Sequence, residues 1–167
     1  PKNIEVIKEI LAAVDIPIQV GGGIRSMETV ENLLGLGAAR VILGTVAILK
    51  PELVSEACAR YGDAVLVGID GRNGRVAIEG WGLIADKGTV ELALEMKELG
   101  VQRVVFTDVR RDGTLKGPNL EATGELARAT GLKVIASGGV STAGDLISLK
   151  RMEDLGVDSV IMGKALY

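Results

Sequence analysis

One carboxylate stands out in this chain because of where it falls. Asp70 ends an apolar run that starts at Ala64, and the glycine-rich stretch 71–81 follows it. Aspartate is disfavoured inside strands and is rarely buried without a partner. Parallel strands present ligands at their carboxyl ends, so a carboxylate in this place indicates a binding or catalytic edge. A purely structural role, as a turn or cap residue, is the alternative for Asp70 at this point.

The amino-acid composition narrows the chemistry that such a carboxylate can join. The 167 residues include no histidine, which excludes serine-type triads, histidine-ligated zinc and imidazole acid–base catalysis. Carboxylates are then the natural proton carriers at neutral pH. We therefore expect any acid–base chemistry of this chain to rest on aspartate and glutamate.

Charge and hydropathy bear on partners and location. The net charge is −3 and no basic run occurs, which indicates neither a nucleic acid nor an anionic membrane as partner. No apolar segment approaches the roughly 20 residues of a membrane span, and no secretory leader opens the chain. The lone Cys58 suits a reducing compartment. We expect a cytoplasmic monomer that binds a small molecule.

Apolar periodicity and end signals, such as Ser26 as an N-cap and Pro51 in a first helical turn, place the secondary structure. The expected strands are 18–20, 41–43, 64–69, 104–108, 134–137 and 159–162, and the expected helices are 3–14, 27–36, 51–60, 89–99, 120–129 and 142–155. Strands this uniformly apolar are typical of a parallel sheet covered by helices. Strict alternation of strand and helix gives either an open doubly wound sheet or a (β/α)8 barrel.

An internal repeat favours the barrel. The segments Gln19–Ser26 and Ile135–Thr142 each contain a strand end, two glycines, an apolar residue and a hydroxyl residue that opens a helix. Gly22 matches Gly138, 116 positions later, and the glycine after the next strand recurs after 119 positions. Four βα units of about 30 residues fit this spacing in a barrel of about 250 residues. The simplest account is a (β/α)8 barrel made of two similar halves, of which residues 1–167 form a single partial domain with strands three to eight.

Glycine turns at strand ends suit phosphate groups, because their backbone N–H groups and the following helix N-terminus attract anions. Barrels often hold a phosphate after strands seven and eight. The repeat then predicts two opposed phosphate sites and a long ligand with a phosphate at each end. The first site comprises Gly22, Gly23, Gly44 and Thr45, and the second comprises Gly138, Gly139, Gly163 and Lys164.

Dinucleotide binding is the competing explanation, since Gly21, Gly23 and Ser26 nearly reproduce a G-x-G-x-x-G fingerprint. It is disfavoured because the third glycine is missing and the next strand does not end in an acidic residue. The repeat also implies that the counterpart of Asp70 would end the first strand, upstream of residue 1. We therefore expect a three-quarter barrel without its first two strands and its last helix.

Five segments together carry a resemblance to a known family. They are Gly21–Ser26, Gly68–Asp70, Gly80-Trp81, Thr107–Leu115 and Ala136–Val140. Over the whole chain the sequence resembles the phosphoribosylformimino-5-aminoimidazole carboxamide ribotide isomerases of histidine biosynthesis. The resemblance implies a (β/α)8 barrel that opens the aminoaldose ring of a bisphosphate and converts it to the aminoketose. This Amadori rearrangement uses no cofactor and no metal.

The resemblance also implies roles for individual residues. Asp70 is the general acid, and the general base is a first-strand aspartate that this chain lacks. Thr107 and Asp112 orient the substrate, although Asp112 alone is also typical of a turn. Arg25 is a ligand contact by resemblance, with a solvated arginine at a helix start as the alternative. Trp81, the only tryptophan, is expected to be a lid that stacks on the imidazole rather than a core residue.

Three alternatives stay open for the function. The cyclase subunit of imidazole glycerol phosphate synthase shares the half-barrel repeat and the paired aspartates, but Gly80-Trp81 favours the isomerase. A dual enzyme that also isomerises phosphoribosylanthranilate is not separated from the isomerase, because the deciding loops are partly missing. A non-catalytic phosphate-binding barrel fragment belongs to a different class of protein.

Overall fold

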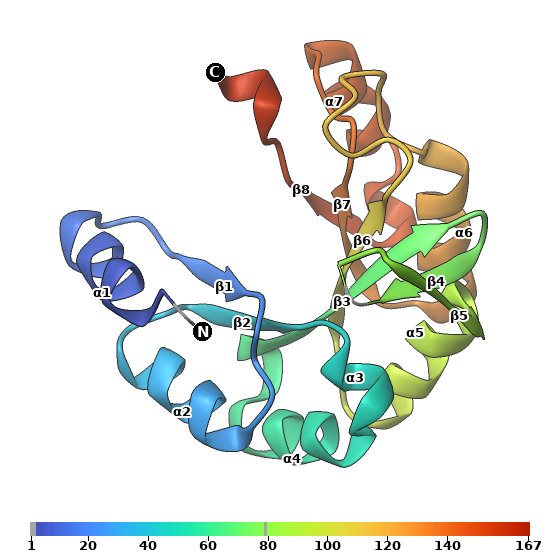
Figure 1. Cartoon of the computed structure of the whole chain (residues 1–167). Helices are drawn as coiled ribbons and strands as arrows, with labels where there is room; N and C mark the ends of the chain where they lie inside the picture. The colour runs from blue at the N-terminus through green and yellow to red at the C-terminus, as the bar shows by residue number, and fades with distance from the viewer. Residues whose placement is uncertain (1–2, 79) are drawn as a thin grey trace.

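The computed structural model describes residues 3–78 and 80–167 and shows a strongly curved parallel sheet (Figure 1). Hydrogen bonds join six parallel strands in the order β1-β2-β3-β6-β7-β8. Their bounds are β1 Gln19–Gly21, β2 Arg40–Leu43, β3 Val65–Arg72, β6 Arg103–Asp108, β7 Lys133–Ser137 and β8 Val157–Val160. All six correspond to strands that the apolar pattern predicts, so the prediction of a partial (β/α)8 barrel is confirmed.

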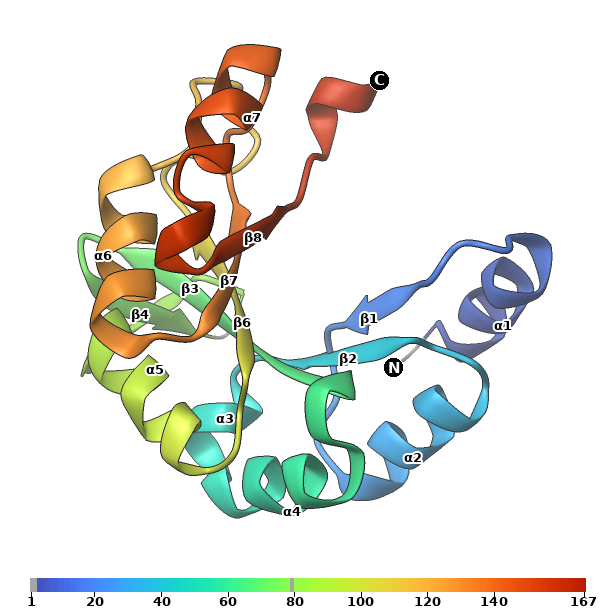
Figure 2. The ribbon, with the colours of Figure 1, turned by 180° about the vertical axis from the view of Figure 1, so that it is seen from behind.

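Helices cover the convex face of the sheet in both views (Figures 1 and 2). They are α1 Ile4–Ala13, α2 Met27–Gly35, α3 Val46–Leu49, α4 Pro51–Tyr61, α5 Thr89–Glu98, α6 Leu120–Thr130 and α7 Ala143–Lys150. The Ser26 hydroxyl accepts a hydrogen bond from the backbone N–H of Thr29, as expected of the N-cap of α2. Gly131 ends α6 in a left-handed conformation that costs glycine little.

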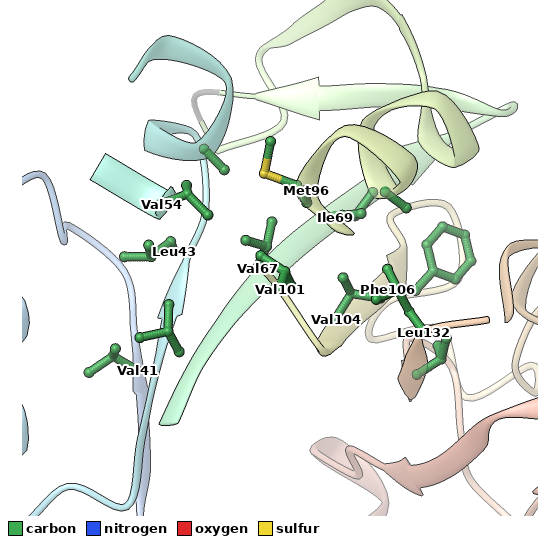
Figure 3. Packing of buried hydrophobic residues seen from close by; sticks show 14 of the residues in the cluster. Val41, Leu43, Val54, Val67, Ile69, Met96, Val101, Val104, Phe106 and Leu132 are labelled. Atoms are coloured by element: carbon green, nitrogen blue, oxygen red, sulfur yellow. The ribbon is translucent and has the colours of Figure 1, made fainter. Parts of the chain in front are cut away.

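The alternation of side chains along the strands separates two apolar clusters. The larger cluster fills the space between sheet and helices and includes Leu43, Val67 and Phe106 (Figure 3). Among the described residues, the smaller cluster consists of Leu66, Val105 and Ile135, with Ile42 packed against them. Because neighbouring residues of a strand point to opposite faces, this smaller cluster marks the concave face. A thin layer of apolar side chains therefore covers the concave face. Further along the same strands, toward their carboxyl ends, the concave face can present polar groups.

The two edges of the sheet are β1 and β8, which do not pair with each other within the described residues. Figure 2 shows the two strands on either side of the open part of the curved sheet. A closed ring of six strands would have contradicted the assignment to barrel strands three to eight. The open order of the strands agrees with that assignment.

The structure corrects the prediction for the segment after Asp70. Instead of a loop, it forms an antiparallel hairpin with β4 Arg75–Ile78 and β5 Leu83–Gly88, and β4 pairs with the end of β3. Asn73 and Gly74 connect β3 to β4 with positive φ of 53° and 76°. Asn-Gly is the favoured pair for such a two-residue turn, so the sequence did carry this signal.

Smaller differences concern element ends. The expected helix 142–155 ends at Lys150 and is followed by the short 3-10 helix Glu153–Leu155, and β8 starts at Val157, earlier than expected. The short helix α3 and two further 3-10 helices, Gly62–Ala64 and Lys164–Leu166, were not predicted. No helix in the described part of the chain combines the length and apolar character that crossing a bilayer requires.

Candidate active site at the carboxyl ends of the strands

Three polar residues lie side by side across neighbouring strands. Asp70 of β3 pairs in register with Thr107 of β6, and Thr107 pairs with Ser137 of β7. Each lies an even number of positions after Leu66, Val105 or Ile135, the residues of the concave cluster. The pleat therefore turns all three polar side chains to the concave face. The structure thus brings Asp70 and Thr107 together, as an active site requires.

Ser137 is a residue that sequence reasoning did not select. It belongs to the Ala136–Val140 segment, but nothing in that segment alone distinguishes it from other turn serines. What identifies Ser137 as a site residue is its pairing in register with Thr107, and this pairing depends on how β6 and β7 align. Sequence alternation places each residue on a face, whereas only strand pairing decides which residues are neighbours.

Trp81 lies against Asp70. The indole Nε1 donates a hydrogen bond to Oδ2 of Asp70 at 2.8 Å. Trp81 is 41% exposed and sits in the connection between β4 and β5, so it is not a core residue. The hairpin that replaces the expected loop therefore carries Trp81 to the candidate acid. Stacking of this indole on an imidazole stays a prediction.

All four members of the second glycine group share one pocket of about 250 Å³ with Asp112. Its lining includes Asp112, Ser137, Gly138, Gly139, Gly163 and Lys164. Asp112 is exposed, and Lys164 reaches over the pocket with Nζ 3.5 Å from the carbonyl oxygen of Gly113. The pocket adjoins the Asp70–Thr107–Ser137 row because Ser137 belongs to both. A cationic side chain and a glycine turn in one small pocket suit an anionic group.

The first glycine group lies at the other end of the sheet. Gly22 and Gly23 follow β1 and line a separate pocket of about 580 Å³ beside α1. Gly44 and Thr45 follow β2, the strand that pairs with β1, so they emerge from the same edge of the sheet. Arg25 is exposed just before α2.

The two glycine turns share a backbone conformation but differ in their surroundings. Gly22 and Gly138 both have φ of 97°, and Gly23 and Gly139 have φ of 70° and 82°. This similarity agrees with the internal repeat. A Cβ on Gly139 would approach the Gly117 carbonyl oxygen to 2.5 Å, whereas nothing lies within 4 Å of a Cβ on Gly22. The second turn is therefore packed against the loop after β6, and the first is open.

A carboxylate supports the packed turn. Asp145 Oδ2 accepts hydrogen bonds from the backbone N–H groups of Ser141 and Thr142, both at 2.9 Å. These bonds, first that from Ser141, lower the pKa of Asp145 below its ordinary value. The Ser141 hydroxyl in turn donates to the carbonyl of Leu115 at 3.1 Å. The cap of α7 thus helps to hold the loop that carries Asp112.

Possible metal ligands do not gather in the described residues. Within 3–78 and 80–167, no three side chains among aspartate, glutamate, cysteine and histidine are grouped to hold a metal ion. The polar groups at the strand ends are instead carboxylate, hydroxyl, indole N–H, ammonium and backbone N–H. Such groups donate and accept protons and bind anions.

Parallel βα units wound into an open curved sheet, with polar side chains at the carboxyl ends of the strands, define a protein of the (β/α)8-barrel class. The comparison with family models is more specific. The model for histidine biosynthesis proteins matches residues 1–167, and the chain belongs to this family.

Curated relatives cover the whole chain. It is 79% identical over 167 residues to the 1-(5-phosphoribosyl)-5-((5-phosphoribosylamino)methylideneamino) imidazole-4-carboxamide isomerase of Pelotomaculum thermopropionicum. The proteins of the same name from Desulforamulus reducens and Moorella thermoacetica are 59% and 54% identical to it. The chain spans 64% of the length of the first relative and 68% and 69% of the other two.

Proposed function

We propose that this chain forms the greater part of an isomerase that acts on a phosphoribosyl aminoaldose in histidine biosynthesis. The relatives are named for a substrate with two phosphoribosyl groups. The observation that carries the proposal is the pairing of Asp70 with Thr107 on the concave face, between glycine groups at opposite ends of the sheet. A substrate with two terminal phosphates would place its reacting sugar over this pair.

The proposed reaction needs an acid and a base. The acid protonates the furanose ring oxygen as the C1–O bond opens, which leaves an imine at C1. A base then removes the proton from C2, and the resulting enol becomes the ketone of the aminoketose as C1 gains a proton. Hydrogen is moved within one molecule, so no external oxidant or reductant is consumed. Carboxylates are suited to both proton transfers.

Asp70 is proposed as the acid because it lies near the carboxyl end of β3, two residues before the strand ends at Arg72, on the concave face, and is partly buried there. Thr107 beside it, and Asp112 at the rim of the second pocket, would hold the sugar hydroxyl groups. We assign the base to an aspartate outside this chain, by resemblance to the family. Trp81 would contact the imidazole ring, which its position over Asp70 supports.

The phosphate sites follow from the two glycine groups. We propose one phosphate in the pocket of about 250 Å³, on the turn Gly138-Gly139 with Gly163 and Lys164. The other would bind at Gly22-Gly23 and Gly44-Thr45, with Arg25 exposed nearby. A cation next to each glycine turn supports this assignment, since a phosphate carries more than one negative charge.

The setting of this activity is also a proposal. We infer that residues 1–167 form a single partial-barrel unit, that the enzyme is a cytoplasmic monomer, and that it binds a bisphosphate rather than nucleic acid or membrane. Cys58 supports a reducing compartment, because it is a buried, unpaired thiol. Burial raises the pKa of this thiol to about 11, so it stays protonated at neutral pH.

The test is an isomerase assay on a completed protein. Residues 1–167 would replace the matching segment of the Pelotomaculum thermopropionicum relative, whose remaining part supplies the rest. We expect conversion of the aminoaldose to the aminoketose at a rate within about tenfold of the intact relative, since 79% of the matching positions are identical. A folded chimera that binds the substrate but does not convert it would contradict the proposed activity.

A further inference from the structure

Asp108 is a carboxylate that faces the helices instead of the candidate active site. It follows Thr107 in β6, and neighbouring residues of a strand point to opposite faces of the sheet. Asp108 is only 8% exposed. A carboxylate buried in this way is costly unless hydrogen bonds satisfy its oxygens. The partners of Asp108 therefore indicate why a carboxylate is placed here.

Both carboxylate oxygens of Asp108 accept hydrogen bonds from the chain that follows β6. Oδ1 accepts the backbone N–H of Arg110 at 2.9 Å, and Oδ2 accepts the side-chain amide of Asn119 at 2.6 Å. Asn119 directly precedes α6, and its Oδ1 accepts the backbone N–H of Ala122 at 3.1 Å, as an N-cap does. The Asp108–Asn119 bond therefore joins the two ends of the loop 109–118.

The same loop carries Asp112. The backbone carbonyl of Asp108 accepts the N–H groups of Arg111 and Asp112, both at 3.0 Å. The turn that presents Asp112 therefore begins at Asp108. Because Arg110 and Asn119 hold the Asp108 side chain, this turn has a fixed starting point.

The joined ends of the loop also lie against the second glycine turn. A Cβ on Gly138 would come within 2.8 Å of the Asp108 carbonyl oxygen. Near the other end of the loop, the backbone N–H of Gly117 donates to the Gly139 carbonyl at 2.9 Å. Since this glycine turn lines the pocket that Asp112 also lines, both contacts set the loop relative to that pocket.

We propose that Asp108 is a positioning residue, which through Asn119 closes the loop 109–118 and so holds Asp112 at the rim of the second pocket. The proposal rests on the proposed function, in which Asp112 holds the sugar of the substrate. Displacing a group in an active site by about 1 Å can lower a rate about 100-fold. The Asp108–Asn119 bond then serves the geometry of the site in addition to the cap of α6.

Exchanging the two side chains tests this bond in the completed protein of the isomerase assay. Asp108→Asn keeps an oxygen for the Arg110 N–H but turns its amide against that of Asn119, and Asn119→Asp sets two carboxylates against each other. We expect each substitution to lower kcat/KM about 10–100-fold. The double variant has one donor and one acceptor again, and its kcat/KM should return to within about threefold of the unchanged enzyme.

Asn119→Asp separates the proposal from a role in helix capping alone. Aspartate and asparagine are about equally good N-caps, so a capping role predicts an unchanged kcat/KM for Asn119→Asp. Such a result would overturn the proposal. A double variant that is no more active than Asp108→Asn would overturn it as well.

Trypsin cleavage measures the state of the loop without relying on activity. Lys116 is exposed in the loop, and cleavage of a native protein follows how often the cleaved segment opens. We expect Asp108→Asn and Asn119→Asp each to speed cleavage after Lys116 about fivefold, and the double variant to restore the slow rate. Mass spectrometry identifies the cleaved bond. Cleavage as slow in both single variants as in the unchanged protein would refute the positioning role.

The two measurements separate this proposal from the proposed function. If the unchanged chimera is inactive, the proposed function fails, while the cleavage rates still decide whether Asp108 and Asn119 hold the loop. If the chimera is active and Asp108→Asn keeps near-normal kcat/KM, the proposed function stands and the positioning role is wrong.

Asp158→Asn is the matched control. Asp158 is a partly buried carboxylate that bonds to Arg103 at 2.5 Å, and both residues lie near the amino ends of their strands, away from the loop. We expect kcat/KM and the cleavage rate after Lys116 to stay within about twofold of the unchanged protein. If Asp158→Asn has the same effects as Asp108→Asn, a general loss of stability explains both results and the proposal is wrong.

Discussion

Asp70 has two polar neighbours that come from other parts of the chain. Thr107 lies beside it in register across β3 and β6, and Trp81 bonds to its carboxylate from the hairpin. A cap residue needs neither neighbour, because capping is satisfied by the backbone of its own turn. These neighbours are what the proposed role of Asp70 in a site requires.

Replacing Asp70 with asparagine tests its proposed role in catalysis. In the completed protein, Asp70→Asn should lower kcat by about 10²–10⁴-fold with KM little changed, since asparagine keeps the shape but carries no transferable proton. Asp86→Asn on the same hairpin is the control and should leave kcat unaltered. Steady-state kinetics provide both constants. Near-normal turnover of Asp70→Asn would remove this residue from the mechanism.

The two matched glycines should respond differently to alanine. Gly22→Ala should cost about 1–2 kcal/mol of unfolding free energy, because its φ of 97° is unfavourable for a residue with a Cβ. Gly139→Ala should cost about 1–3 kcal/mol more, because the new Cβ also meets the Gly117 carbonyl. Urea unfolding measures both values. Equal costs would mean that the packed turn adjusts without strain.

Phosphate affinity of the same two variants addresses the binding sites. Isothermal titration of the completed protein with inorganic phosphate should detect two sites, and each alanine should weaken one of them. Loss of both sites in a single variant would contradict two separate glycine sites.

At the scale of elements, the cap of α7 joins two loops of the site. Asp145 bonds to the first residues of α7, and Ser141 bonds onward to Leu115 in the loop after β6. The corresponding cap of α2 contains the neutral residue Thr29 in place of Asp145. Of these two corresponding caps, that of α7 is charged and that of α2 is neutral.

This difference predicts a pH effect on stability. The pKa of Asp145 is lowered in the folded protein, so its stabilisation is present above the pKa of the unfolded chain, about 4, and is lost as pH falls through the folded value. Asp145→Asn should lower Tm at pH 7 and have a smaller effect near pH 3. Thr29→Ala should lower Tm equally at both pH values. Thermal unfolding monitored by circular dichroism makes the comparison.

At the scale of the whole molecule, the open edges dominate the behaviour of the isolated chain. Within residues 3–78 and 80–167, β1 and β8 each lack a strand partner on their outer side. Apolar side chains are exposed on the helices beside them, including Ile10 on α1 and Ile147 on α7. Free edges and exposed apolar surface promote association. We expect residues 1–167 alone to self-associate and to show no isomerase activity, and the chimera to be monomeric.

Sedimentation velocity over a range of concentrations measures this association. Edge variants such as Ile10→Lys and Ile147→Lys should reduce it, whereas Leu94→Lys, at an exposed position on α5 away from both edges, should not. A monomeric and active 1–167 chain would contradict the expectation.

The sequence by itself determined the kind and order of the main elements. Six apolar runs became six parallel strands, and signals such as Ser26 and Pro51 placed helix starts, because these features depend on local preferences and on burial of both strand faces. The repeat and the family motifs also marked Asp70, Thr107 and the two glycine groups in advance. The Asn73-Gly74 hairpin signal was present but was read as part of a loop.

Only the tertiary structure decided which residues are neighbours. The register of β6 on β3 and β7 set Asp70, Thr107 and Ser137 in one row, and the hairpin brought Trp81 to Asp70. The packing of Gly139 against the loop after β6 likewise follows from how separate βα units meet. Local sequence specifies which face of a strand a residue occupies and where the chain turns. Strand pairing and packing arise from contacts between segments far apart in the chain, and no single stretch of sequence encodes these contacts.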